Sequence, residues 1–278
     1  MKNILAFQDK TEFKKEKRSI IWKNNLSYVV IPLLILFTWQ VSLSVLNVPV
    51  YFLPKPTDIV SAAVENWRNL TLALGVTVIE ALVGFILSII IGILGAILLA
   101  TSKVVEKITY PYIIILQTIP IVAIAPIIVI WFGAGMNAII IITFLMGFFP
   151  MLSNTLLGLK STDQNLKDLF NLYEASKFQT LLHLKILYAL PYMVAGLKIS
   201  STLVVIGAIV GEYVAGVGGG KGGLGFAITQ AALRLQTPYL FACALTAALL
   251  GISFFYIVGK ISNIILSSWH ESEMQKEN

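Results

Sequence analysis

The chain has few charged residues and almost no cysteine or histidine. Asp, Glu, Lys and Arg make up 12% of its 278 residues, which is about half the share usual in soluble domains. Its one cysteine, Cys243, cannot form a disulfide within the chain, and its two histidines, His183 and His270, lie far apart in the sequence. These scarcities argue against a secreted disulfide scaffold, a metal or redox centre and a soluble enzyme.

What the sequence has instead is apolar residues, which make up 57% of the chain against roughly 45–50% in soluble domains. A helix that crosses a bilayer needs about 20 mostly apolar residues. Six segments meet that requirement: 27–46, 76–100, 109–132, 136–157, 192–214 and 238–263. The sequence therefore predicts an all-α, polytopic membrane protein with six transmembrane helices.

The distribution of Lys and Arg predicts the orientation of these helices. With the N-terminus inside, 15 of the 20 basic residues fall on the cytoplasmic side and 4 on the external side. Cytoplasmic loops of membrane proteins carry such an excess, so we expect both termini to be cytoplasmic. The expected parts are a basic N-terminal segment 1–26, a transmembrane domain 27–263 and a tail 264–278. The net charge of +6 reflects this topology and gives no reason to expect nucleic acid as a partner.

The cytoplasmic stretch 160–190 is long and helical in pattern. Ser161, Thr162 or Asp163 can cap a helix start. Apolar residues recur at helical spacing in two groups, first Leu166, Leu169, Phe170 and Tyr173, and then Phe178, Leu181 and Leu182. This pattern predicts two short helices with a bend near residues 174–176, the second ending near Pro191.

Several separated motifs resemble the permease subunits of type I ABC importers of the nitrate, sulfonate and taurine type. These subunits carry a cytoplasmic EAA loop, and here Asp168-Leu169-Phe170 fall at its Glu-Ala-Ala positions. Glu174-Ala175-Ser176 fall at its Gly-Ala-Ser positions. Leu53-Pro54-Lys55-Pro56 and Gly223-Leu224-Gly225 match the family's external segments. The resemblance covers about residues 50–265.

The resemblance implies a six-helix, MetI-like permease fold in the bacterial inner membrane, with no cofactor and no catalytic site of its own. It implies three kinds of protein partner: cytoplasmic ABC ATPase subunits, an extracytoplasmic solute-binding protein and a second permease, for which we expect a second copy of this chain. The lipid bilayer surrounds the assembly. The residues that the resemblance assigns to ATPase coupling are Asp168, Leu169, Phe170, Tyr173, Glu174, Ala175 and Ser176.

The loop departs from the family pattern at its bend. Glu174 replaces the usual glycine, so either this residue adopts a positive φ that glycine tolerates better, or the bend is built differently. Leu169 and Phe170 replace two alanines. Their apolar side chains, with that of Tyr173, either contact the ATPase or pack against the permease's own helices.

A few polar residues within the apolar runs are candidates for the translocation pathway or its gate. Glu212 lies near the external end of the fifth predicted span, where it either faces the pathway or bonds to the neighbouring glycine-rich segment. Gln117 and Thr118 either face the pathway or form hydrogen bonds between helices. Glu80 lies near the external end of the second span, where pairing with Arg68 or Arg234, or simple hydration, is expected.

Two matters stay open from the sequence. An ion-coupled secondary transporter or channel without an ATPase is the alternative to an ATP-driven importer. The solute is also open among sulfonates, nitrate, bicarbonate and heterocyclic vitamin precursors. No cluster of cations in the apolar runs demands an anion.

Overall fold

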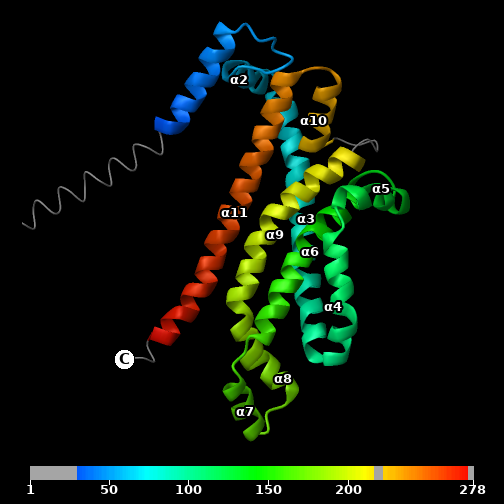
Figure 1. The fold of residues 1–278 in the computed structure, drawn as a ribbon, viewed down its shortest axis with the longest axis vertical. Helices are drawn as coiled ribbons and strands as arrows, with labels where there is room; N and C mark the ends of the chain where they lie inside the picture. The colour runs from blue at the N-terminus through cyan, green and yellow to red at the C-terminus, as the bar shows by residue number, and fades with distance from the viewer. Residues whose placement is uncertain (1–29, 216–221, 275–278) are drawn as a thin grey trace, which may run out of the picture.

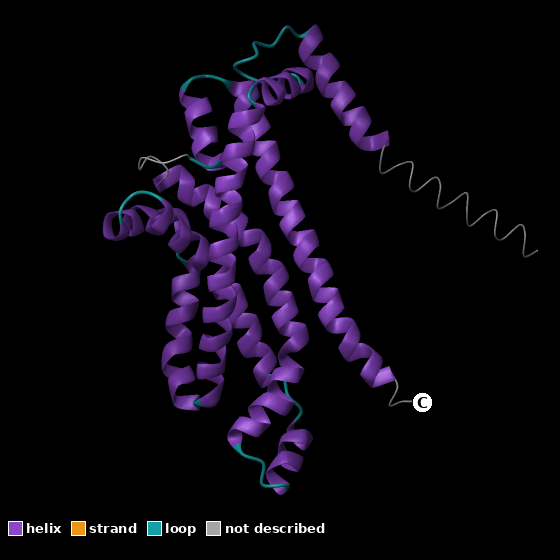
Figure 2. Cartoon of the chain, turned by 180° about the vertical axis from the view of Figure 1, so that it is seen from behind, coloured by secondary structure: helices purple, strands orange, loops and turns teal. Residues whose placement is uncertain are grey.

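A computed structural model describes residues 30–215 and 222–274, and these residues fold into helices joined by short loops (Figure 2). The helices are Val30–Val45, α2 Pro56–Glu65, α3 Trp67–Thr101, α4 Lys103–Thr118, α5 Ile121–Phe132, α6 Met136–Lys160, α7 Gln164–Leu172, α8 Lys177–Thr180, a π-helical turn Leu181–Lys185, α9 Ile186–Ala215, α10 Leu224–Leu233 and α11 Thr237–Met274. The predicted N-terminal segment 1–26, the first residues of the first predicted span and the last four residues of the tail lie outside the described residues.

The all-α membrane architecture predicted from the sequence is confirmed. Four helices are long and apolar enough to cross a bilayer, namely Trp67–Thr101, Met136–Lys160, Lys177–Ala215 and Thr237–Leu266. The described part of the first predicted span, Val30–Val45, is a shorter apolar helix. The described residues thus do not reproduce six straight spans, because the third predicted span is broken.

That break is a correction to the sequence prediction of one span over 109–132. Helices α4 and α5 meet at an angle of 100°. Ile119 between them is extended, with φ −72° and ψ 125°, as expected for a residue whose α-conformation would clash with the ring of the following Pro120. Proline alone does not decide the break, since Pro126 lies inside α5 without interrupting it.

Helices α3, α6 and α9 form the packed centre of the molecule (Figure 1). Small residues allow the backbones of these three helices to lie close together. Where they do, serine hydroxyl groups form hydrogen bonds from one helix to the next. Ser88 of α3 donates to the carbonyl of Phe144 at 2.8 Å, and Ser200 of α9 donates to the carbonyl of Gly147 at 2.7 Å. Such close contacts through small residues are how membrane helices associate without a hydrophobic driving force.

We expect Gly84→Ala to destabilise the protein by about 1–3 kcal/mol through overpacking. A Cβ at this position would lie 2.7 Å from the Cβ of Thr143, a fully buried side chain of α6. The matched control is Gly75→Ala on the same helix, where a Cβ meets nothing within 4 Å. Thermal unfolding of the purified protein checks this, and equal melting temperatures for the two variants would contradict the close α3–α6 packing.

The two ends of the molecule carry different elements (Figure 1). The short helices α7 and α8 lie at one end, beyond the ends of α6 and α9. Helices α2 and α10 lie at the other end, beside the first turns of α3 and α11. The site described below therefore has three parts: one at the α7–α8 end, one beside the α4–α5 break, and one at the α10 end.

Candidate functional site

The segment 160–190 forms the two short helices that the sequence predicts, with one difference. Helix α7 is capped by Asp163, whose carboxylate accepts from the backbone N–H of Asn165 at 2.7 Å. Helix α8 starts with a capping box, in which the Ser176 hydroxyl and the Gln179 side chain each accept from the other residue's backbone N–H. The second helix does not end near Pro191. It continues through the π-helical turn into α9, so Lys177–Ala215 is one unbroken helical rod.

The bend between α7 and α8 is a Schellman motif with glutamate at the position that usually holds glycine. Ala175 N–H donates to the carbonyl of Phe170, and Glu174 N–H donates to that of Asn171, both at 3.0 Å. Glu174 has φ +51°, so the first of the two possibilities raised by the sequence is the one realised. The left-handed conformation costs a non-glycine residue roughly 1–2 kcal/mol, which the two hydrogen bonds of the motif offset.

Large apolar side chains stand exposed on this loop. Leu172 is 80% exposed, Tyr173 is 78% exposed and Phe178 is 70% exposed. Leu169 is also exposed, while Phe170 is half-buried. We call the exposed set Leu169, Leu172, Tyr173 and Phe178 the loop surface. Phe178 was named from the sequence only as part of the second helical pattern and Leu172 was not named, although the apolar character of Leu172 beside polar neighbours was a usable signal.

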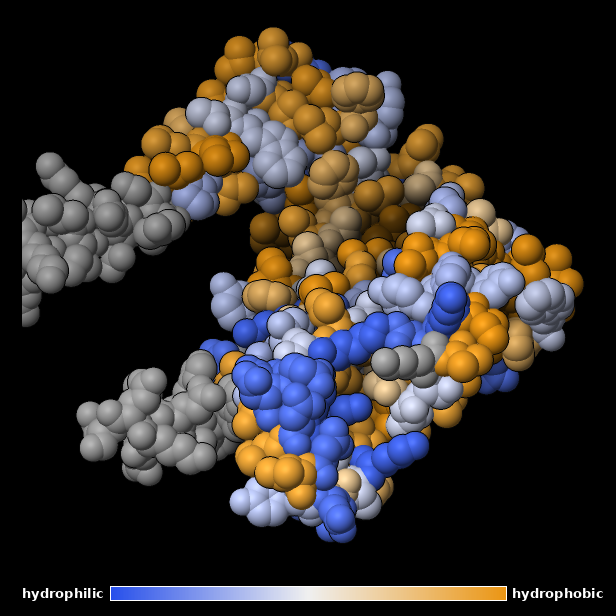
Figure 3. Space-filling model, turned by 60° about the horizontal axis from the view of Figure 1, so that its bottom comes forward, coloured by the Kyte–Doolittle hydropathy of each residue, from blue (hydrophilic) through white to orange (hydrophobic). Residues whose placement is uncertain are grey.

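The loop surface lies at an end of the molecule that carries many polar side chains. Seen from this end, hydrophilic side chains gather around α7 and α8, with apolar side chains beside them (Figure 3). Asp168 is exposed there, and its carboxylate accepts from the Gln164 side chain at 2.9 Å. Exposed apolar groups rimmed by polar ones are typical of a protein interaction surface.

A cavity of about 790 Å³ lies beside the α4–α5 break. Its walls come from the end of α4, the start of α5, the middle of α6 and Leu203 of α9. Gln117 and Thr118 both line it, together with Ser153 and Asn154. No charged side chain of the described residues lines this cavity. Its size falls within the range of small-molecule sites, about 300–1,000 Å³.

Glu212 does not line that cavity. It is 1% exposed and lies among α3, α9 and α10. Its carboxylate accepts from the Thr77 hydroxyl at 2.6 Å and from the backbone N–H of Gly225, and Thr77 in turn accepts from Leu224 N–H at 2.8 Å. The sequence left two possibilities for Glu212, facing the pathway or bonding to the glycine-rich segment, and the structure shows the second. Glycine at position 223 allows the Glu212 carboxylate to lie against the backbone, since a Cβ there would lie only 2.6 Å from Glu212 Oε2.

Glu80 corrects a sequence expectation. It is buried rather than solvent-exposed, and it pairs with no arginine among the described residues. It is 2% exposed, its carboxyl group is hydrogen-bonded to that of Glu212, and its Oε2 atom has no partner among the described residues. Glu80, Thr77 and Glu212 thus form a buried polar cluster, which we call the carboxyl cluster, holding the first turn of α10 against α3 and α9.

Comparison with known proteins adds a family match. Residues 88–265, more than half of the chain, match the model of the binding-protein-dependent transport system inner membrane component. The chain is 35% identical over 242 residues to the formylaminopyrimidine transport permease protein ThiX of Halalkalibacterium halodurans, covering 87% of this chain and 94% of that protein. It is 28% identical over 241 residues to the putative aliphatic sulfonates transport permease protein SsuC of Bacillus subtilis, covering 84% and 82%.

Among solved structures, the chain is similar to a crystal structure of an amino acid ABC transporter with histidines. The TM-score is 0.57 at 15% identity, over 72% of this chain and 95% of that chain. This likeness shows a shared fold.

Proposed function

The chain belongs to the family of binding-protein-dependent transport system inner membrane components and is a permease subunit of an ABC importer, and from that premise we propose how its parts serve transport. The α7–α8 loop receives the ATPase on the cytoplasmic side. The cavity beside Gln117 is part of the translocation pathway, and the α10 end faces outward. ATP hydrolysis belongs to a separate subunit in such systems.

The observation that carries this proposal is the continuous rod Lys177–Ala215. One end of the rod carries Phe178 of the exposed loop surface, and Leu203 further along it lines the cavity. Because the rod is helical throughout, a displacement of the loop moves the cavity wall with it. The chain therefore connects a cytoplasmic docking surface mechanically to the pathway.

The base of the loop is tied to the opposite cavity wall as well. Lys160, the last residue of α6, forms an ion pair with Glu106 in the first turn of α4. Helix α4 ends at Thr118 on the cavity. An exposed pair of this kind contributes about 0–1 kcal/mol, so it serves to keep α4 beside α6 during the motion rather than to drive it.

For the second permease we propose a second copy of this chain. Helix α5 packs Ala125 and Ile128 against α6, whereas its last apolar side chains, Ile130, Trp131 and Phe132, are exposed. The cavity borders the same helix. Closing the pathway by a two-fold-related copy covers this face and gives the cavity its second wall.

For the solute we propose an uncharged, hydrogen-bonding molecule of the pyrimidine kind over a sulfonate. The names of the two relatives given above indicate different solutes, a formylaminopyrimidine for ThiX and aliphatic sulfonates for SsuC. The cavity presents the side-chain amides of Gln117 and Asn154 and the hydroxyl groups of Thr118 and Ser153, without a cation. Amide groups donate to and accept from a neutral heterocycle, whereas a sulfonate in an apolar cavity lacks a compensating charge.

Co-purification tests the partner assignment. The chain is expressed together with candidate ATPase and binding-protein genes from the same genome, and the tagged permease is isolated from the membrane. We expect the ATPase to co-purify, and native mass spectrometry to show two copies of each of the two subunits. A permease that purifies alone in functional form, or always with a different permease chain, contradicts this proposal.

A further inference from the structure

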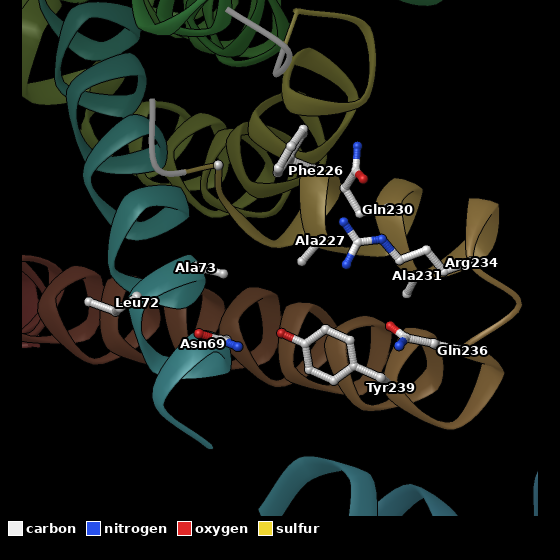
Figure 4. A pocket seen from close by; sticks show the side chains of 11 residues that line it. Asn69, Leu72, Ala73, Phe226, Ala227, Gln230, Ala231, Arg234, Gln236 and Tyr239 are labelled. Atoms are coloured by element: carbon white, nitrogen blue, oxygen red, sulfur yellow. The ribbon is translucent and has the colours of Figure 1, made fainter. Parts of the chain in front are cut away.

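A second cavity, separate from the pathway, lies at the α10 end. It has a volume of about 380 Å³ and is lined by the start of α3, one face of α10 and the start of α11. It shares no lining residue with the cavity beside Gln117. Figure 4 shows side chains from all three helices around it, with Arg234 reaching back along α10 toward Gln230 and Tyr239 opposite, on α11. We call it the Arg234 pocket.

Arg234 is the one charged residue that lines this pocket within the described part of the chain. Its guanidinium forms no ion pair or hydrogen bond with any described residue, and the residue is exposed. Around it stand the amides of Asn69, Gln230 and Gln236 and the hydroxyl of Tyr239. A guanidinium binds a carboxylate through two parallel hydrogen bonds, and neighbouring amide and hydroxyl groups can donate to the same oxygens.

The wall that carries Arg234 is fixed at both ends. Helix α10 ends in a second Schellman motif, in which Leu235 N–H donates to Ala232 at 3.1 Å and Gln236 N–H donates to Ala231 at 2.9 Å. Leu235 takes φ +55° there. At its start, α10 is held by the carboxyl cluster through the N–H groups of Leu224 and Gly225. The pocket is therefore a preorganised feature of the fold.

We propose that the Arg234 pocket is the point at which the extracytoplasmic binding protein inserts an acidic side chain into the permease. This inference rests on the proposed function, since it takes the α10 end to be external. An unpaired cation ringed by uncharged donors is complementary to a single carboxylate. The volume of the pocket, about 380 Å³, is sufficient for an Asp or Glu side chain. It also lies at the end where the family's external partner delivers solute.

The test measures how tightly the purified binding protein binds the permease–ATPase complex in nanodiscs, by surface plasmon resonance. Arg234→Glu is expected to weaken binding about tenfold or more, as loss of an interface arginine typically does, and Arg234→Gln by less. The matched control is Arg68→Glu, an exposed cation at the same end that does not line the pocket. Its affinity is expected to stay within about twofold of the parent, as for a rim charge.

A reversed charge in the partner completes the experiment. Changing each surface Asp or Glu of the binding protein to Lys should reveal one variant that restores binding to the Arg234→Glu permease. Equal affinities for the parent and Arg234→Glu overturn the inference. The inference is also overturned if Arg234→Glu weakens binding in nanodiscs with anionic lipids but not in purely zwitterionic ones. That result would assign the pocket to an anionic lipid headgroup. Retention of the ATPase in every variant shows that only this inference, and not the proposed function, has failed.

Discussion

The double variant Leu172→Asp, Tyr173→Asp is expected to abolish ATP-driven uptake while the permease still inserts and folds. Both side chains are about four-fifths exposed, so charged replacements cost the isolated permease little. At a docked interface the same changes place two carboxylates in a desolvated apolar contact. Central interface residues typically account for about 2 kcal/mol or more each, so ATPase affinity should fall by roughly a hundredfold or more.

The measurement is titration of the permease in nanodiscs with purified ATPase, alongside uptake in vesicles. The control is Leu233→Asp, which makes the same chemical change to an exposed apolar side chain at the opposite end. This control should retain full ATPase affinity. Unchanged ATPase binding by the double variant would remove the loop surface from the coupling interface.

Glu212→Ala is expected to destabilise the protein by about 2–4 kcal/mol, because it leaves buried hydrogen-bonding groups without partners. The Gly225 N–H loses its acceptor, the Thr77 hydroxyl keeps only the Ala73 carbonyl at 3.2 Å, and Glu80 loses its neighbour. Helix α10 then loses its attachment to α3 and α9 at its first turn. Thermal unfolding and the hydrogen-exchange rates of the α10 amides measure these effects.

Two controls separate the network from a general effect of removing carboxylates. Glu80→Gln should be mild, since a hydrogen bond between two carboxyl groups already requires a proton on one of them, and an amide can supply the same donor. Glu65→Ala removes an exposed carboxylate and should change stability by no more than about 0.5 kcal/mol. If Glu212→Ala is as stable as Glu65→Ala, the carboxyl cluster does not hold α10.

The loop and the long helices could be predicted from sequence because their signals are local. Continuous apolar runs predicted four of the spanning helices, and Asp163, which caps α7, is one of the three cap candidates named from residue type and spacing. The bend near residues 174–176 was also predicted, while its backbone form was left open between a positive φ at Glu174 and a different construction. Glu174 drew attention because it occupies the position at which the family's loop usually has glycine. Its positive φ follows from the hydrogen bonds of the turn.

The break between α4 and α5 could not be predicted, because hydropathy does not change across it. Proline offered no guide, since Pro111, Pro126, Pro150 and Pro191 all lie inside helices. At Pro150 the backbone is supported by Asn154, which donates to its carbonyl at 2.8 Å. At Pro120, by contrast, α4 has already ended at Thr118, Ile119 is extended, and the chain turns.

The pairing of Glu80 with Glu212 in the carboxyl cluster was missed for a different reason. Glu80 and Glu212 are far apart in the chain, and single-sequence reasoning assigns a charge near a membrane interface to the nearest opposite charge or to water. The structure brings the two acids together because α3 and α9 cross beside the start of α10. Only the glycines of Gly223-Leu224-Gly225 hinted at it, since they allow the backbone to approach a carboxylate.

ATP-dependent uptake by the reconstituted complex tests the central claim most directly. Vesicles carry the permease and ATPase, with ATP inside and the loaded binding protein outside. Uptake should require all three components, stop with a non-hydrolysable nucleotide and persist when proton and sodium gradients are collapsed. Solute accumulation driven by an ion gradient, in vesicles that contain this permease and no ATPase, would contradict the account.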